Sequence, residues 1–451
     1  MLVALLWQGP AHAANPLKPA DPKYHTFDDP HGFVFEDRVY LFASHDASPQ
    51  NKGFVLWDWW VWSSADLVSW DLESVLKPES TYIGKPFKDC WATFGVQKNN
   101  QWYWYVSMGS ENIAVFTADS PKGPWRDVLG KPLIPAGLTH TQARDPEILL
   151  DDDGAAYMVY GTFNYYIVRL NPDMISLAEK PRQIVIRNPE GPYGKGKTDD
   201  KPSLHKRDGI YYLSWSSHYA MSTNVYGPYE YKGSVIEPGT VADDFRQKDL
   251  DWDRHGNFLE FNNQWYYACN DHSQPGQHKY YRNSIMMYVH YRDNGEIAPV
   301  RIDRIGVGEY DAAQGRIEAE DYFKSRDAEK RECKEGGFEM RLRQGSALYY
   351  PKVHNLPAMA RLRLSVACAN PGGARVEVRD GSPKGALLGS VHIEPTGGWD
   401  VFKEVPCLIE NKAGTTDLCL FFGGEGEEIL RMDWMSFSME SRKVNQNESN
   451  R

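Results

Sequence analysis

Cysteine is scarce in this 451-residue chain, and no two cysteines form a C-x-x-C pair. The six lie at positions 90, 269, 333, 368, 407 and 419. This spacing excludes a zinc ribbon and a dense disulfide framework. Four of the six follow residue 330, so a single disulfide in that region and partly buried free thiols are both left open.

Long apolar runs and an excess of basic residues are also missing. After the N-terminus, no run reaches the roughly 18 apolar residues that a membrane span needs. The net charge is −11, and no basic cluster interrupts the sequence. We therefore expect neither a membrane span nor a nucleic-acid partner.

The first residues, MLVALLWQGPAHAANP, contain a short apolar run followed by Ala11-His12-Ala13. The segment resembles a signal peptide with an A-x-A cleavage site, although no Lys or Arg precedes the run. We interpret residues 1–13 as the remnant of a signal peptide and expect a secreted or periplasmic protein.

Aromatic residues, in contrast, are abundant, with 15 Trp and 26 Tyr. Aromatic side chains suit β-strands. The faces of Trp and Tyr also match the apolar C–H faces of sugar rings. Composition alone leaves both interpretations open.

One strand pattern occurs five times, as EDRVYLFAS, NNQWYWYVS, DDGAAYMVYG, RDGIYYLSWS and NNQWYYACN. Each copy is a polar turn followed by an apolar strand with a central tyrosine, which is the signature of a hairpin. Their spacings are 63, 54, 55 and 54 residues, and the tyrosines are Tyr40, Tyr103, Tyr157, Tyr212 and Tyr266. A second strand–turn–strand pattern between the copies gives about four strands per unit. The fold class is therefore all-β, with a five-bladed β-propeller predicted over residues 20–308.

After residue 308 the pattern changes to short alternating strands such as ARLRLSVACA, ARVEVRDG and RMDWMSFS. Such strands predict a β-sandwich, jelly-roll-like in type, over residues 314–440. A polar segment, residues 441–451, follows it.

Each central tyrosine is preceded, eleven or twelve residues earlier, by a residue of functional interest. These residues are Asp29, Trp91, Asp145, Asp200 and His255. Equivalent positions in propeller blades converge at one end of the central axis, so we expect these five side chains to meet in one funnel. Carboxyls gathered in a pocket raise one another's pKa, and two carboxyls with different pKa values can carry out glycoside hydrolysis.

The segments DDPHGFVFEDRVYLFASHD, ARDPEILLDDDGAAYMVYG and HGNFLEFNNQWYYA resemble glycoside hydrolase family 43. The resemblance implies an inverting five-bladed propeller enzyme, closest in pattern to arabinofuranosidases and β-xylosidases. It implies that Asp29 is the general base and that Asp145 modulates the pKa of the acid and orients the substrate. It also implies that His255 lies on the axis, beside a bound calcium or water.

The same resemblance implies a general acid nine residues before the turn glycine of the fourth blade, where this chain has Asp200 in place of the family's Glu. The alternative is Glu190 of the sequence Glu190-Gly191-Pro192, ten residues earlier. We expect Asp200 to lie in the funnel with a raised pKa, because Asp29 and Asp145 are near. On an extended strand Lys201 would point to the opposite face. Asp199 is expected to be an ordinary solvated carboxylate.

Three further residues are candidates for substrate binding. Trp91 is a stacking floor for a sugar or else a core residue. His45 follows the first Tyr-centred strand and is expected at the rim. Arg144 is expected either to hold Asp145 ionised or to form a surface ion pair.

The C-terminal stretches IEAEDY, TGGWDVF and MDWMSF resemble carbohydrate-binding module family 6. The resemblance implies a structural calcium held by Glu318, Glu320 and Asp433, and a sugar cleft that includes Trp399. Two other cleft positions differ from the family, because Ala347 replaces an aromatic residue and Arg431 replaces an Asn. Sugar binding in this cleft and a purely structural role are both left open.

Taken with the resemblance, the sequence predicts an exo-acting inverting glycoside hydrolase. It would release terminal α-L-arabinofuranose or β-xylose from plant cell-wall polysaccharides or oligosaccharides. The alternatives are a galactose-type glycosidase, for galactofuranose or galactopyranose, and a catalytically impaired sugar-binding propeller. We expect no organic cofactor, a structural calcium, a carbohydrate as the partner and a monomer.

Overall fold

The computed structural model describes residues 13–439 except 22, 23, 25, 26, 51, 246–252, 274, 275, 335 and 413. The predicted signal segment, apart from Ala13, and the polar segment 441–451 lie outside the described residues. The described residues divide into two compact units, which are residues 13–261 with 265–307 and residues 308–439 with 262–264. Within the described residues, no helix is long and apolar enough to cross a membrane.

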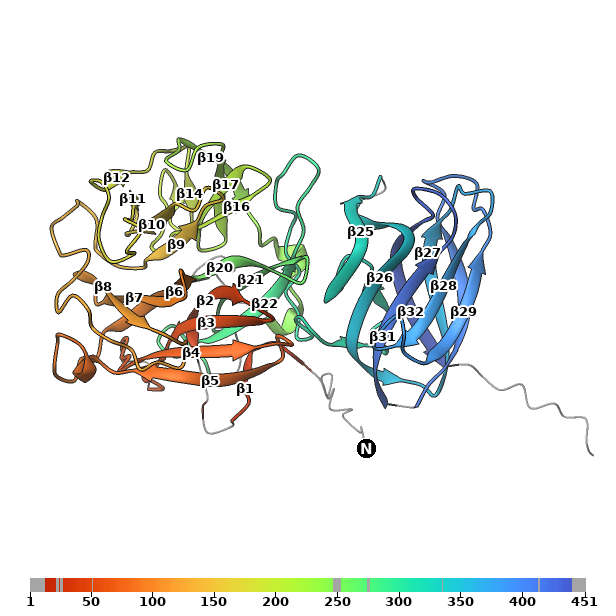
Figure 1. Cartoon of the computed structure of the whole chain (residues 1–451), viewed down its shortest axis with the longest axis horizontal. Coiled ribbons are helices and arrows are strands. Elements are labelled where there is room, and N and C mark those ends of the chain that lie inside the picture. Colours follow the sequence, from red (N-terminus) through yellow and green to blue (C-terminus); the bar gives the residue numbers. More distant parts are fainter. Residues whose placement is uncertain are drawn as a thin grey trace, which may run out of the picture. The chain divides into compact units, whose positions relative to one another are not determined.

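The first unit is a five-bladed β-propeller, which confirms the predicted architecture (Figure 1). Blade one is the sheet β1-β5-β4-β3-β2, with β1 (Lys18–Pro19), β2 (Asp28–Phe35), β3 (Arg38–Ser44), β4 (Trp59–Ser64) and β5 (Ser69–Leu76). Blade two is β6-β7-β8, with β6 (Cys90–Lys98), β7 (Gln101–Met108) and β8 (Asn112–Ala118). Blade three is β12-β11-β10-β9, with β9 (Glu147–Leu150), β10 (Ala156–Tyr160), β11 (Tyr166–Arg169) and β12 (Arg182–Gln183).

The fourth and fifth blades complete the ring. Blade four is β13-β19-β18-β17-β16, with β13 (Ile186–Arg187), β16 (Ser203–Arg207), β17 (Ile210–Trp215), β18 (His218–Ser222) and β19 (Tyr229–Ser234). Blade five is β20-β21-β22, with β20 (Gly256–Phe261), β21 (Gln264–Asp271) and β22 (Asn283–Val289). Between β13 and β16 lies a small hairpin of β14 (Glu190–Gly191) and β15 (Gly194–Lys195). The only helices assigned in the described residues are the 3₁₀ turns η1 (Pro78–Ser80), η2 (Pro238–Thr240) and η3 (Asp243–Phe245).

The N-terminal segment closes the propeller ring. The buried Asn15 side chain donates to the carbonyl of Met286 at 3.0 Å and accepts from its backbone N–H at 2.9 Å. The N–H of Leu17 donates to Ser284 in the same strand, β22. Directly afterwards, β1 pairs in parallel with β5 of blade one. Residues 14–19 therefore link blade five to blade one.

The strand register shows which residues occupy equivalent places in the blades. The tyrosines Tyr40, Tyr103, Tyr157 and Tyr212 lie in the second strand of their blades, opposite Phe33, Val96, Leu149 and His205. Four residues before these partners stand Asp29, Ala92, Asp145 and Lys201. Lys201, rather than Asp200, is therefore the strand equivalent of Asp29 and Asp145.

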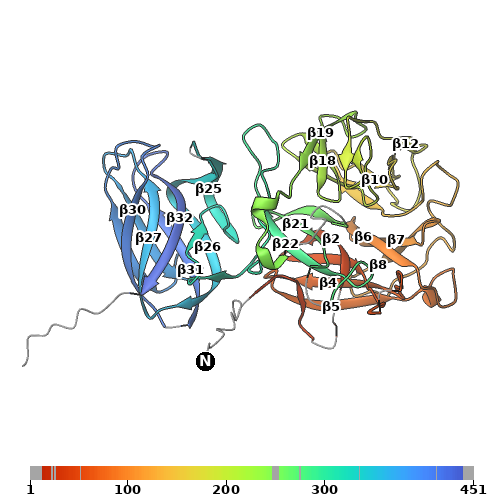
Figure 2. The ribbon, with the colours of Figure 1, turned by 180° about the vertical axis from the view of Figure 1, so that it is seen from behind.

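The second unit is one long sheet that curves into a nearly closed sandwich, as predicted (Figures 1 and 2). Its main path runs β29-β28-β31-β26-β32-β27-β30, and β23, β24 and β25 pair with members of that path. The bounds are β23 (Tyr310–Asp311), β24 (Arg316–Glu318), β25 (Lys324–Glu332), β26 (Phe338–Leu356), β27 (Met359–Ala367), β28 (Ala374–Asp380), β29 (Leu387–Ile393), β30 (Lys403–Glu410), β31 (Gly414–Gly423) and β32 (Leu430–Met439).

The core of this unit is aliphatic and buries Cys368 and Cys407. All six cysteines are free, so the structure contains no disulfide among them. The predicted alternative of buried thiols holds for five of them, because only Cys333 is partly exposed.

Candidate active site

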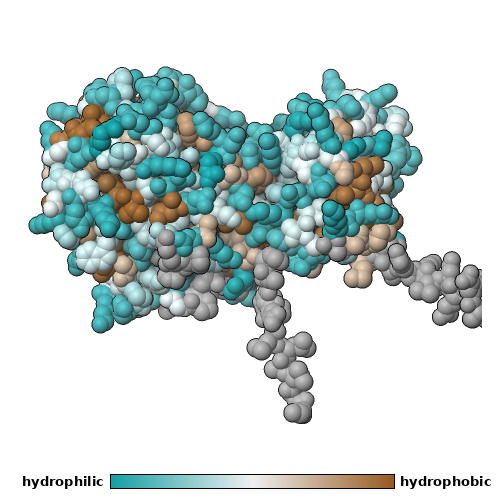
Figure 3. All heavy atoms as spheres, turned by 60° about the horizontal axis from the view of Figure 1, so that its bottom comes forward, coloured by the Kyte–Doolittle hydropathy of each residue, from teal (hydrophilic) through white to brown (hydrophobic). Residues whose placement is uncertain are grey.

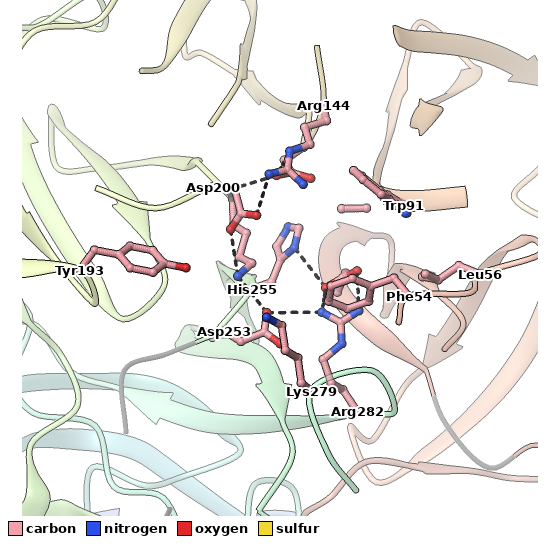
Figure 4. A pocket seen from close by; sticks show the side chains of 14 residues that line it. Phe54, Leu56, Trp91, Arg144, Tyr193, Asp200, Asp253, His255, Lys279 and Arg282 are labelled. Carbon is pink, nitrogen blue, oxygen red and sulfur yellow. Dashed lines mark hydrogen bonds and ion pairs between the residues drawn. The ribbon is translucent and has the colours of Figure 1, made fainter. Parts of the chain in front are cut away.

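A pocket of about 260 Å³ lies in the propeller unit, and residues from several blades line it (Figure 4). Its lining consists of Asp29, Phe54, Leu56, Trp91, Ala92, Arg144, Asp145, Tyr193, Asp200, Lys201, Asp253, His255, Lys279 and Arg282. Six of the residues singled out from the sequence therefore meet here, namely Asp29, Trp91, Arg144, Asp145, Asp200 and His255.

Asp29 is buried and held by donors on both carboxylate oxygens. Arg282 donates to Oδ1 at 2.8 Å, Asn270 donates to Oδ1 at 2.7 Å, and Ser44 donates to Oδ2 at 2.6 Å. The ring of His255 lies 3.1 Å from Oδ1. Burial alone would raise the pKa of Asp29, but Arg282 and His255 outweigh burial and hold this pKa well below its usual range. Asp29 is therefore a carboxylate at neutral pH.

Arg282 organises the base of the pocket. Its guanidinium contacts Asp28, Asp29 and Asp46 at 2.8–3.0 Å and Asp253 at 3.4 Å. Four buried carboxyls therefore surround this one guanidinium, and Asp253 also pairs with Lys201 at 2.8 Å. Burial and the neighbouring Asp46 raise the pKa of Asp28 well above its usual value. The protonated form is therefore favoured at Asp28 rather than at Asp29.

Asp145 is also buried, and it lies just before β9 of blade three. Its backbone N–H donates to Ser107 at 2.9 Å, and its Oδ2 accepts the N–H of Lys201 at 3.2 Å. Burial raises the pKa of Asp145 in spite of the nearby Arg144, whose Nε lies 3.8 Å away. The guanidinium of Arg144 lies over the ring of Trp91, 5.2 Å from the centroid, so Arg144 and Trp91 form one wall.

Asp200 lies in the pocket as expected, but the expectation of a raised pKa is wrong. Lys201 Nζ lies 2.9 Å from Asp200 Oδ1, and Arg144 lies 3.0 Å from its Oδ2. Burial would raise the pKa of Asp200, yet Lys201 and Arg144 hold it below the ordinary value. Lys201 does not point to the opposite face because its φ of +69° is left-handed, and the side-chain alternation of an extended strand does not apply there.

Asp199 is not a solvated carboxylate, so this expectation is also wrong. Its side chain is buried, accepts the N–H of Asp200 at 2.9 Å and accepts the hydroxyl of Ser216. Burial raises the pKa of Asp199 to about 6, in spite of the ammonium of Lys201 at 3.8 Å.

Replacement of Asp199 by Asn is therefore expected to stabilise the protein at pH 8. An Asp has a pKa of about 3.9 when unfolded, so a folded pKa near 6 means that the folded state loses stability as the pH rises through this window. The loss at pH 8 is at most about 3 kcal/mol. Melting temperatures at pH 8 and pH 4 test this, and the gain should disappear at pH 4. Asp208→Asn, at a mostly exposed side chain, is the control; an equal gain there, or a gain independent of pH, would contradict the explanation.

His255 contacts both Asp29 and His31. It is buried, and its ring packs edge-to-face on His31 with centroids 4.9 Å apart. Burial alone would lower the pKa of His255, but Asp29 raises it. Its Nε2 has no hydrogen-bond partner among the described residues. The role of His255 beside a bound calcium stays a prediction.

Two candidates lie elsewhere. His45 is outside the pocket lining, stacked on Trp60 with ring centroids 3.8 Å apart and 3.3 Å from Asp58. Glu190 opens β14 and does not line the pocket, and its backbone carbonyl accepts the indole N–H of Trp215 at 3.0 Å. The structure thus gives Asp200, rather than Glu190, a place in the pocket.

Sequence reasoning did not identify Phe54, Tyr193, Asp253, Lys279 and Arg282 as pocket residues. None of them shares the repeated offset from a central tyrosine. Arg282 immediately precedes β22, the third strand of its blade, and a search for buried-looking Arg beside the last strand could have found it.

In the sandwich unit, the face of Trp399 is covered by an arginine. The guanidinium of Arg431 lies 5.4 Å from the centroid of the Trp399 ring. Arg431 is held there by ion pairs to Glu339 at 3.1 Å and to Glu428 and Asp400. One face of the Trp399 ring is therefore occupied by Arg431 in this arrangement.

The three carboxylates predicted to bind calcium do not form a cage. Arg316 lies 3.2 Å from Glu318 and 3.8 Å from Asp433. Glu320 is buried, and burial together with Asp321 raises its pKa well above the usual value. In the part of the chain that the structure describes, no three His, Cys, Asp or Glu side chains are grouped to hold a metal ion. The calcium in this unit stays a prediction.

Three carboxyls, those of Asp29, Asp145 and Asp200, gathered in one small pocket of a propeller fit a protein that hydrolyses glycosidic bonds. Comparison with protein families gives the same class. The chain belongs to glycosyl hydrolases family 43, whose family model matches residues 21–297. Residues 318–439 match the model of carbohydrate binding module family 6.

Two of the relatives that the chain resembles match it across both units, and a third matches about 60% of it. An arabinoxylan arabinofuranohydrolase of Paenibacillus polymyxa is 27% identical, over 91% of this chain and 72% of that protein. An arabinoxylan arabinofuranohydrolase of Bacillus subtilis is 25% identical, over 92% of this chain and 91% of that protein. A xylosidase/arabinosidase of Bacteroides ovatus is 25% identical, over 60% of this chain and 94% of that protein.

Solved structures share the fold. The family 43 arabinoxylan arabinofuranohydrolase of Bacillus subtilis superposes with a TM-score of 0.56 at 22% identity, over 95% of this chain and 98% of that one. An α-L-arabinofuranosidase of Clostridium thermocellum gives a TM-score of 0.50 at 25% identity, over 62% of this chain and 95% of that one.

Proposed function

We propose that this protein is an exo-acting inverting glycoside hydrolase that releases terminal α-L-arabinofuranose or β-xylose from plant cell-wall polysaccharides or oligosaccharides. Relatives over most of the chain are named arabinoxylan arabinofuranohydrolases, and another is named a xylosidase/arabinosidase. The fold and the site both support this assignment.

The observation that carries the proposal is the pocket that contains Asp29, Asp145 and Asp200. Its volume of about 260 Å³ lies just below the range of about 300–1,000 Å³ that drug-sized ligands fill. A pocket of this size suits one sugar unit rather than a continuous chain. The apolar surfaces of Phe54, Leu56 and Trp91 supply the wall against which a sugar face can pack (Figure 4).

We assign the general base to Asp29, because Arg282, His255, Ser44 and Asn270 keep its carboxylate ionised. We assign the general acid to Asp200. Asp145 would orient the substrate and, through its contact with the N–H of Lys201, position the neighbouring acid. Because Lys201 and Arg144 stabilise the ionised form of Asp200, the enzyme would be most active at acidic pH, where more of Asp200 is protonated.

A panel of nitrophenyl glycosides tests the sugar and the stereochemistry together. We expect hydrolysis of the α-L-arabinofuranoside or the β-D-xyloside and little hydrolysis of β-D-galactofuranosides. Proton NMR in the first minutes should show the anomer opposite to that of the substrate. Release of the same anomer would contradict single displacement, and a preference for galactofuranoside would contradict the sugar assignment.

We also propose that the protein is secreted and that it binds a structural calcium ion. The apolar start of the chain and Ala11-His12-Ala13 support export. Glu318 and Glu320 are close in sequence, and Glu318 pairs with Trp434, the residue after Asp433. This proximity supports a calcium site. Arg316, which contacts Glu318 and Asp433, would have to move before the ion could bind. Binding of ⁴⁵Ca²⁺ to the purified protein would test it.

A further inference from the structure

Two exposed aromatic rings lie beside the pocket, and the assigned catalytic roles do not use them. The Tyr193 side chain is 46% exposed and the Phe163 side chain 49% exposed. Their rings meet edge-to-face, with centroids 5.6 Å apart and planes at 66°. We call this pair the aromatic platform. On the face shown in Figure 3, apolar side chains are gathered in a few patches within a mostly hydrophilic surface, so such exposure is not the general rule.

The platform is continuous with the pocket. Tyr193 lines the pocket itself and stands at the tip of the β14–β15 hairpin. In the close-up of Figure 4, its ring approaches from the side of Asp200, opposite Trp91, Phe54 and Leu56. Trp91, Phe54 and Leu56 form the apolar wall on one side of the pocket. On the side of Asp200, Tyr193 extends the apolar surface of the pocket outward.

The other ring of the platform is fastened to the segment that carries Asp200. Phe163 has a left-handed φ of +59°, which is unfavourable for a bulky residue. This conformation is fixed because its N–H donates to the carbonyl of Asp199 at 2.8 Å and its carbonyl accepts the hydroxyl of Thr198 at 2.7 Å. Backbone strain of this kind persists where the surrounding structure enforces it, often at functional sites.

A second connection runs through side chains. The Nε–H of Arg144 donates to the hydroxyl of Thr162, the neighbour of Phe163, at 2.8 Å. The guanidinium of Arg144 also pairs with the carboxylate of Asp200 at 3.0 Å. The platform therefore lies on the side of the proposed acid, Asp200. In a single displacement the leaving group departs on the side of the acid, and water attacks from the side of the base.

We propose that Phe163 and Tyr193 form the binding site for the leaving-group side of the substrate, where a neutral pyranose of the polysaccharide backbone stacks. A pyranose with equatorial hydroxyls offers an apolar C–H face, which an exposed aromatic ring binds without needing a charge. This inference rests on the proposed function, since it names what the pocket's substrate is attached to.

The test compares substrates with and without a leaving sugar. For wild type, Tyr193→Ala, Phe163→Ala and the double variant, kcat/KM is measured on an arabinose-substituted xylo-oligosaccharide, on xylotetraose and on the matching glycosyl fluorides. For the oligosaccharide that wild type cleaves, we expect the double variant to lower kcat/KM by a factor about tenfold larger than for the matching glycosyl fluoride. Tyr193→Trp should restore most of the loss. Val185→Ala, an exposed apolar residue of blade four, is the matched control. Equal losses on both substrates, or no loss, would overturn the inference.

A binding measurement keeps this test separate from the proposed function. In the Asp29→Asn background, calorimetry with both oligosaccharides reports affinity without turnover. Weaker binding after removal of the platform supports the site even if wild type cleaves neither substrate, which would instead refute the proposed function. Unchanged affinity in variants that melt like wild type would overturn the platform while leaving the proposed function intact.

Discussion

Replacement of Asp29 by Asn is expected to lower kcat/KM by about 10²–10⁴-fold without a loss of folding. General base catalysis contributes a factor of this size. Asn retains the shape of the side chain. Its one carbonyl oxygen can still accept from Arg282, and its NH₂ group can donate to the Ser44 hydroxyl, which bonds the other carboxylate oxygen in the native site. It cannot take a proton from the attacking water. The loss should appear in kcat on every glycoside, including activated aryl glycosides, because water must be activated whatever the leaving group.

Asp28→Asn is the matched control for this loss. Asp28 is buried beside Asp29 and contacts the same Arg282, but it does not line the pocket. Burial and Asp46 raise the pKa of Asp28, so the neutral Asn resembles its favoured form. We expect this variant to keep at least about a tenth of the wild-type rate, a small loss beside that of a general base. Equal rates for the Asp28 and Asp29 variants would remove Asp29 from the chemistry.

Replacement of Lys201 by Gly is expected to move the alkaline limb of the kcat/KM profile to higher pH. That limb reports the pKa of the group that must be protonated to donate. The ammonium at 2.9 Å holds the pKa of Asp200 low, so its removal raises this pKa. Glycine also tolerates the left-handed φ of +69° at this position. A shift of about one pH unit would give about a tenfold gain near neutral pH.

Substrates with different leaving groups distinguish a change in the pKa of Asp200 from a general loss of active-site structure. The gain should be large for oligosaccharides, whose leaving oxygen needs a proton, and small for dinitrophenyl glycosides, which leave without one. Lys201→Arg keeps the positive charge and should keep the wild-type profile. If the limb stays in place in the Gly variant, Asp200 is not the group whose protonation limits the rate.

The placement of the site could be predicted because a propeller repeats its geometry. Residues that precede the central tyrosines by the same number of positions occupy equivalent places in their blades. They therefore lie at the same end of the propeller axis. For this reason Asp29, Asp145 and His255 could be placed in one pocket from spacing alone, and the structure has them there. The five strands around Tyr40, Tyr103, Tyr157, Tyr212 and Tyr266 were predictable for the same reason.

The electrostatics of the site could not be predicted in this way. The direction of the Lys201 side chain depends on its left-handed backbone, whereas a residue before Pro is expected to be extended. Asp29 and Asp145 also precede a Pro and are also left-handed. The burial of Asp199 depends on Ser216, a residue of the next hairpin. The low pKa of Asp29 depends on Arg282, which lies 253 residues away in sequence. Such contacts exist only after the ring has closed.

The closure of that ring also determines when the pocket can exist during synthesis. Asn15 is among the first propeller residues to leave the ribosome, and its partner Met286 follows 271 residues later. Contacts of such long range slow folding, because the chain must search a large loop before they form. A nascent chain that ends within blade four lacks the blade-five partners of Asn15 and Leu17, and it has neither Arg282 nor His255 to stabilise Asp29. Carboxylates without their cation would repel one another, so the active site should be among the last parts of the propeller to become ordered.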